Sequence, residues 1–164
     1  YTVAEKAGAA VDVALAKDAP PPAGYDVVVV GDSIHMARHS RRLTRYIAAH
    51  ANELDQQPLA LFQVSLTSAN DDDAHSTDAH EMIQRLVTAT GIDPDLVGLF
   101  AGSLAYTKYG WFKKRLMRRI AESEGGDTDT TQDHEYTDWD AVDEFARHAV
   151  ALASVDPTVE TNNA

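Results

Sequence analysis

Residues 25–33 read Tyr-Asp-Val-Val-Val-Val-Gly-Asp-Ser, and residues 96–103 read Leu-Val-Gly-Leu-Phe-Ala-Gly-Ser. Neither run alternates apolar with polar residues, which is typical of strands buried on both faces in a parallel sheet that helices cover on two sides. In such sheets a ligand binds in the crevice beyond the carboxyl ends of the strands. Because Gly31-Asp32-Ser33 and Gly102-Ser103 end the two runs, we expect a binding site beside them.

Length and composition indicate one globular domain. The chain has 164 residues, of which 44% are hydrophobic, enough to bury a core. No apolar run approaches the roughly 20 residues that a membrane-spanning helix needs, and the N-terminus lacks a signal pattern, so we expect a cytoplasmic protein. The absence of cysteine excludes thiol catalysis, disulfides and cysteine metal sites.

The chain is strongly acidic. Its 18 Asp and 8 Glu outnumber 9 Arg and 5 Lys, for a formal net charge of −12. This charge disfavours nucleic acid as a general partner, because phosphates would be repelled. A surface rich in Asp and poor in Lys resembles that of proteins from halophiles, and an ordinary acidic cytoplasmic protein is the alternative.

Apolar spacing and turn residues predict strands that alternate with helices, which indicates a parallel α/β sheet. After an insertion at 104–136 comes a last helix, for which Thr137 or Asp138 is a natural N-cap. We expect residues 1–153 to form one domain and the polar residues 154–164 to be a disordered tail. We expect strands at 11–15, 26–31, 59–66 and 96–102. We expect one helix that begins near Thr2 and three more at 40–53, 81–90 and 138–153. The segments 18–24 and 67–78 are expected to be loops.

Four stretches in a fixed order carry a resemblance: Tyr25 to Ile34, Ala101 to Tyr106, Gly125 to Thr130 and Tyr136 to Trp139. With Trp111-Phe112 and a basic helix between the second and third, they resemble the menaquinone-dependent protoporphyrinogen IX dehydrogenases, a flavodoxin-like family. The resemblance runs from Thr2 to about Leu152. It implies an α/β three-layer sandwich with a central parallel sheet, in which the first strand is missing and an insertion follows the last buried strand.

The start of the chain departs from this family. Members begin with a strand and a phosphate-binding loop of Ser/Thr and Gly residues that runs into the first helix, whereas here only Thr2 matches the loop's last hydroxyl. In the flavodoxin order the first strand lies between the second and the third. A strand near Val13 would then lack its partner and leave backbone groups unpaired, so we expect the sequence to be a fragment of a longer chain.

The resemblance implies that FMN is the cofactor and that four segments bind it. Thr2 would contact the phosphate, and the alternative is that it only caps a helix. For Asp32 and Ser33 the alternative to flavin contact is likewise that one of them caps the next helix. Asp32 is unexpected beside an electron-accepting ring, because a carboxylate disfavours the anionic reduced flavin. The implied contacts to the flavin are Asp32, Ser33, Ile34, His35 and Met36 in one loop, Leu66, Thr67 and Ser68 in a second, and Gly125 and Asp127 in a return turn.

Two other groups of residues have some features of metal sites. His35 and His39 are four residues apart, a spacing that places two imidazoles on one helix face, but no third ligand is in view. The run Asp71 to Asp73 lacks the glycine turn and terminal Glu of a calcium loop, so it is interpreted as a solvated loop. We therefore predict no metal.

The insertion combines aromatic and basic residues. Five of the 14 basic residues fall within positions 113–119, a pattern typical of a membrane-surface helix or a carboxylate site, with a solvated basic face as the alternative. The resemblance implies a porphyrinogen substrate with two propionates and a quinone acceptor in the bilayer, hence peripheral contact at the inner face of the cell membrane. The residues expected to bind substrate or membrane are Tyr106, Tyr109, Trp111, Phe112, Lys113, Lys114, Arg115, Arg118 and Arg119.

The resemblance thus implies FMN-dependent oxidation of protoporphyrinogen IX to protoporphyrin IX in heme biosynthesis, with a quinone such as menaquinone as acceptor. The flavin would carry the redox chemistry, and the protein would supply position and electrostatics. No acid–base pair or nucleophile stands out, so no catalytic residue is predicted. The alternatives are a flavodoxin-type electron carrier or quinone reductase, and a flavin-free, non-enzymatic relative.

Overall fold

Three parallel strands form the centre of the molecule. The structure is a computed structural model that describes residues 2–65, 73–104, 107, 115, 118, 119, 122, 129 and 131–154, of which 73–77 and 104 are described by their backbone only. The strands β1 (Val28–Ser33), β2 (Leu59–Val64) and β3 (Leu96–Phe100) lie in the order β1-β2-β3. Two short strands, β4 (Ser103–Leu104) and β5 (His134–Glu135), pair antiparallel beyond β3.

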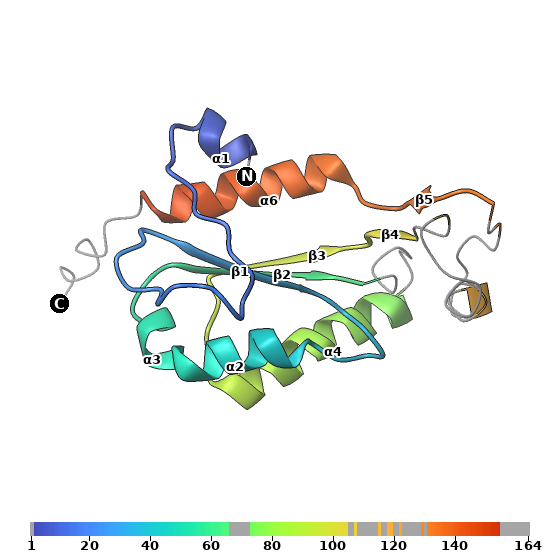
Figure 1. Cartoon of the computed structure of the whole chain (residues 1–164), viewed down its shortest axis with the longest axis horizontal. Coiled ribbons are helices and arrows are strands. Elements are labelled where there is room, and N and C mark those ends of the chain that lie inside the picture. The colour runs from blue at the N-terminus through green and yellow to red at the C-terminus, as the bar shows by residue number, and fades with distance from the viewer. Residues whose placement is uncertain are drawn as a thin grey trace.

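Helices cover both faces of this sheet (Figure 1). On one face lie α2 (Arg41–Ala49), α3 (Ala51–Leu54) and α4 (Asp73–Thr90), and on the other lies α6 (Trp139–Leu152) with the short helix α1 (Thr2–Lys6) packed against it. The predicted three-layer α/β arrangement is therefore confirmed.

The central strand is the most buried. Leu59 and Leu61 of β2 are at most 1% exposed and pack with Val30 against apolar residues of the helices. Burying one such side chain stabilises the fold by about 1.5–3 kcal/mol. Leu43 and Ile47 of α2, Leu54 of α3, and Ile83 and Leu86 of α4 form the helix side of this core.

Both faces of the outer strands were expected to be buried, and this is wrong at two positions. Val29 of β1 is 46% exposed and Val97 of β3 is 40% exposed. The reason is that both strands are edges, since within the described residues no further strand of the parallel sheet lies beside either of them. Only β2 has a neighbouring strand on each side.

Aromatic rings fill the other face. Phe62 of β2, Phe100 of β3 and Phe145 of α6 are mutual neighbours, with ring centroids 5.6 to 6.2 Å apart. The strand glycines leave space for these rings: a Cβ on Gly31 would lie 2.0 Å from Phe62 Cζ, and one on Gly98 would lie 2.7 Å from Phe145 Cδ2. A glycine inside a strand here marks close approach of an aromatic ring.

Several element predictions are confirmed with shifted ends. The predicted strands 26–31, 59–66 and 96–102 correspond to β1, β2 and β3, and the predicted last helix is α6, whose cap Asp138 accepts hydrogen bonds from Asp140 N and Ala141 N. The predicted helix 40–53 is interrupted at His50, between α2 and α3.

Two predictions are wrong. Residues 11–15 form no strand, and Val13 and Leu15 are 77% and 65% exposed, because no neighbouring strand supplies the backbone hydrogen bonds that a strand needs. The predicted loop 67–78 is helical from Asp73 onward. Residues 66–72 and the predicted tail from 155 on lie outside the described residues.

Candidate functional site at the carboxyl ends of the strands

Three strand ends and the segment before α6 meet at one edge of the sheet. Ile34 N donates to Val64 O at 2.8 Å, and Ser65 N donates to Phe100 O at 2.9 Å, so the chain stays paired as it leaves β1 and β2. Tyr136 N donates to Gly102 O at 3.0 Å, which attaches the returning chain to the end of β3. This edge is where a parallel α/β sheet binds its ligand.

The approach at Gly102 is tight. Its φ is +77°, a left-handed conformation that favours glycine, and a Cβ there would lie 2.6 Å from Val64 Cγ1. The end of the run at Gly102-Ser103 therefore has two physical reasons for its glycine.

Asp32 closes the loop between β1 and α2. Its Oδ1 accepts a hydrogen bond from Ser33 N at 3.0 Å, and its Oδ2 accepts a short one from Ser40 N. Ser40 in turn caps α2 by accepting from Leu43 N. Asp32 is therefore not the cap of α2 that the alternative expected: its carboxylate is turned to the base of the loop and holds Ser40, which is the cap. Flavin contact by Asp32 stays a prediction.

The tip of the same loop is strained. Met36 and Ala37 have φ of +54° and +55°, a conformation that costs a residue with a side chain about 1–3 kcal/mol. Reciprocal hydrogen bonds of 3.2 Å between the main chains of His35 and Arg38 hold this turn. It presents the apolar side chain of Met36, which is 94% exposed, to the outside.

His39 lies on the inner side of the loop. Its side chain is 7% exposed, and its Nδ1 lies 3.8 Å from Asp32 Oδ2. Burial lowers the pKa of His39 below its ordinary value of 6.5, and the Asp32 carboxylate and the main chain of Met82 oppose this shift. The expectation that His35 and His39 share a helix face is wrong, because both precede α2 and His35 is exposed.

The other predicted residues are not gathered at this edge. Thr2 is an exposed residue of α1, which lies against α6 (Figure 1), and no hydrogen bond of Thr2 is found within the described part of the chain. Arg115, Arg118 and Arg119 are helical and exposed, and Arg118 Nε donates to Glu122 Oε1 at 3.1 Å. Outside the described residues lie Leu66, Thr67, Ser68, Tyr106, Tyr109, Trp111, Phe112, Lys113, Lys114, Gly125 and Asp127.

Two further observations concern metal and membrane binding. Among the described residues no group of three or more His, Asp or Glu side chains is placed to hold a metal ion. In the same part of the chain no helix is long and apolar enough to cross a bilayer.

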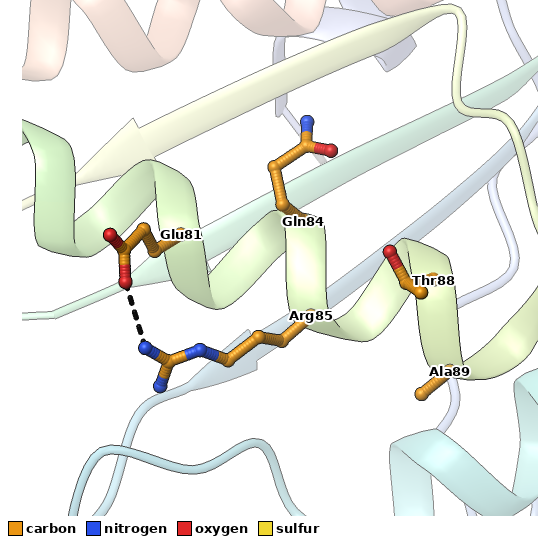
Figure 2. Close-up of a pocket in the computed structure, with 5 residues that line it drawn as sticks. All are labelled: Glu81, Gln84, Arg85, Thr88 and Ala89. Atoms are coloured by element: carbon orange, nitrogen blue, oxygen red, sulfur yellow. Dashed lines mark hydrogen bonds and ion pairs between the residues drawn. The ribbon is translucent and has the colours of Figure 1, made fainter.

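A hollow of about 450 Å³ runs along α4, away from this edge (Figure 2). It is lined by residues of a single helix, and its two charged side chains pair with each other, Arg85 Nη2 lying 2.8 Å from Glu81 Oε2. The carboxyl edge, where several elements converge, is the better candidate site.

Comparison with known proteins identifies the family. A family model described as "Flavodoxin domain" matches residues 2–131. The chain is 36% identical over 141 residues to "Protoporphyrinogen IX dehydrogenase (quinone)" of Leishmania major, and 30% identical over 128 residues to the protein of that name from Escherichia coli (strain K12). The chain belongs to the protoporphyrinogen IX dehydrogenase family of flavodoxin-domain proteins.

The alignments cover most of this chain and less of the relatives. They include 85% of the chain and 61% of the Leishmania dehydrogenase, and 78% of the chain and 70% of the Escherichia coli dehydrogenase. No solved structure matches the chain significantly. The predicted flavodoxin-like fold is confirmed by the family model together with the parallel sheet.

A flavodoxin domain implies a flavin cofactor. The described residues of this dehydrogenase-family chain fit the ring of such a group, because the strained turn holds Met36 outward beside Ile34 and Ser33 at the carboxyl edge. The predicted phosphate contact, Thr2, is not at this edge, because α1 is packed on α6. The fit is therefore to the flat, apolar part of the flavin.

Proposed function

We propose that this chain oxidises protoporphyrinogen IX to protoporphyrin IX, with FMN as its cofactor and a quinone as electron acceptor. The observation that carries the proposal is the identity of 30–36% to proteins named for this reaction, over 78% or more of the chain. The loop at 32–40, held by Asp32 and strained at its tip, supplies a physical site in support.

Each loop residue has a distinct role in this proposal. Ile34 and Met36 supply apolar contact to the flavin ring, and the Ser33 hydroxyl offers a hydrogen bond to its polar edge. Bound FMN supplies the redox chemistry by accepting hydride equivalents from the substrate. Because the Asp32 carboxylate accepts two main-chain hydrogen bonds at the loop base, it is turned away from the loop tip, which lessens the repulsion expected toward a reduced ring.

We further propose that the basic segment at 113–119 binds acidic groups, either the substrate's carboxylates or the surface of the membrane that holds the quinone. Its described members Arg115, Arg118 and Arg119 are exposed, and they stand out in a chain of net charge −12. Basic residues beside aromatic ones suit an anionic interface. In this proposal the protein is cytoplasmic and peripheral at the inner face of the cell membrane.

The test is turnover. The chain, loaded with FMN in molar salt, is mixed anaerobically with protoporphyrinogen IX and a soluble quinone, and the fluorescence of protoporphyrin IX is followed. The proposal expects product in proportion to enzyme and to quinone. Reduction of the quinone by other donors with no porphyrin formed would contradict it and favour the electron carrier or quinone reductase.

A further inference from the structure

A groove of about 300 Å³ lies between the loop before α2 and the outer face of α4. Residues from three segments line it, so it is formed by tertiary packing rather than by one helix. Its polar residues include Arg38, His39, Thr44 and Arg85, and its apolar residues include Met82 and Leu86.

His39 is the unusual residue in this groove. Its side chain is more than nine-tenths buried, and neither ring nitrogen makes a well-formed hydrogen bond, although the main chain of Met82 lies near enough to favour the charged ring. Asp32 Oδ2, at 3.8 Å from Nδ1, is beyond hydrogen-bond distance and already accepts from Ser40 N. Leaving a buried polar group unpaired costs about 1–3 kcal/mol, and folded proteins rarely do so. An imidazole that lines a groove in this state is suited to a ligand.

The charge around the groove is positive. Four of the nine arginines, Arg38, Arg41, Arg42 and Arg45, fall within eight positions and are exposed. Within the described part of the chain Arg38 makes no ion pair, whereas Arg85 pairs with Glu81 on the neighbouring turn of α4 (Figure 2). Among the described acidic groups, Asp32 lies near His39 and is held at the loop base. Of these four arginines Arg38 lines the groove, and an unpaired arginine beside a buried histidine favours an anion there.

We propose that this groove binds a small organic carboxylate. The carboxylate accepts hydrogen bonds from the Arg38 guanidinium and lies beside the His39 ring, whose nitrogens are covered in the unbound chain, and its apolar body lies on Met82 and Leu86. A single unpaired arginine matches one negative charge, and the apolar floor distinguishes such a ligand from inorganic phosphate. The groove shares the loop at 32–40 with the proposed flavin site but is lined by Ala37, Arg38 and His39 and not by Ser33, Ile34 and Met36. This inference does not depend on the proposed function.

The test uses the whole chain and butyrate as the probe. The ring signals of His39 are followed by NMR and are assigned by their loss in His39→Gln. We expect a saturable shift with butyrate and a rise in the pKa of His39 at saturation, because a bound anion favours the protonated ring. Arg38→Ala should weaken butyrate binding about tenfold, as the loss of one charge-assisted hydrogen bond predicts. Arg45→Ala, exposed on α2 and outside the groove, is the matched control.

Three results would overturn the proposal. In the first, the His39 signals do not move with butyrate. In the second, neutral butyramide moves them as much, which means that the carboxylate is not recognised. In the third, phosphate binds more tightly than butyrate, or Arg45→Ala weakens butyrate binding as much as Arg38→Ala does. Either outcome would mean that the chain responds to anions in general.

Discussion

Gly31 precedes the loop of the candidate site, and its replacement by alanine tests how the sheet supports that loop. The added Cβ would lie 2.0 Å from Phe62 Cζ, 2.1 Å from Cε1 and 2.5 Å from Cε2. The Phe62 ring must therefore move, and with it its contacts with Phe100 and Phe145, both at 6.2 Å between centroids. Gly31 is not among the glycines with positive φ, so the effect is steric and not conformational.

Two opposing effects set the magnitude. Overpacking a core costs about 1–3 kcal/mol, and replacing a glycine in a compatible conformation gains about 0.4–1 kcal/mol by restricting the unfolded chain. We expect Gly31→Ala to lower the free energy of unfolding by about 1–2 kcal/mol. The assay is urea unfolding in molar salt, monitored by circular dichroism. An unchanged slope of the free energy of unfolding against urea concentration would indicate that the substitution leaves the unfolded state the same.

A second background makes the experiment specific. In Phe62→Leu the ring is gone, so Gly31→Ala should cost close to nothing, a coupling energy of about 1–2 kcal/mol between the two positions. An equal cost in both backgrounds would refute the steric reasoning, and so would a Gly31→Ala protein as stable as the parent.

Three further predictions concern the site and its surroundings. In a fluorescence titration Met36→Gly should weaken flavin binding about fivefold to tenfold, because partial burial of a methionine side chain contributes about 1 kcal/mol. The control Ala37→Gly relaxes the same strained turn but keeps Met36, so it should leave the flavin affinity within about twofold. Equal losses of affinity in the two variants would contradict the role of Met36. Because the pKa of His39 is lowered by folding, the unfolded chain takes up a proton on this residue first as the pH falls below about 6.5. The free energy of unfolding should therefore fall from that pH down to the pKa of His39 in the folded chain. Urea unfolding at pH 8 and pH 5 should show a smaller loss for His39→Gln than for the parent or for the control His148→Gln, which is exposed on α6. Replacing Arg115 and Arg119 by Glu should weaken sedimentation with anionic vesicles by roughly 1 kcal/mol or more per residue, and a similar loss in the exposed control Arg147→Glu would show a general charge effect instead.

Local sequence signals predicted much of the fold. Asp138 at the start of α6, Ser40 at the start of α2 and the continuous apolar run of β2 depend on neighbours in sequence, and each was found where the pattern indicated. The strand expected at 11–15 was wrong because pairing depends on a neighbouring strand and not on the apolar residues of the segment itself.

The candidate site was predictable in its position and less so in its details. The glycines at 31 and 102 mark the strand ends, but no pattern shows that Phe62 and Val64 are what a Cβ would meet there. The inward turn of the Asp32 carboxylate follows from hydrogen bonds within the loop, and the burial of His39 follows from how the loop packs on α4. Such contacts between distant segments leave no periodic signal in the sequence.

The most direct test of the central claim is a titration of this chain with FMN and with riboflavin, which has the ring without the phosphate, following flavin fluorescence in molar salt. Because the described residues fit the ring, the account predicts saturable quenching by both flavins, weakened for both by Met36→Gly. If neither flavin is quenched, by this chain or by one extended to the length of its relatives, the assignment of a flavin site to the carboxyl edge is contradicted and a flavin-free relative becomes the better account.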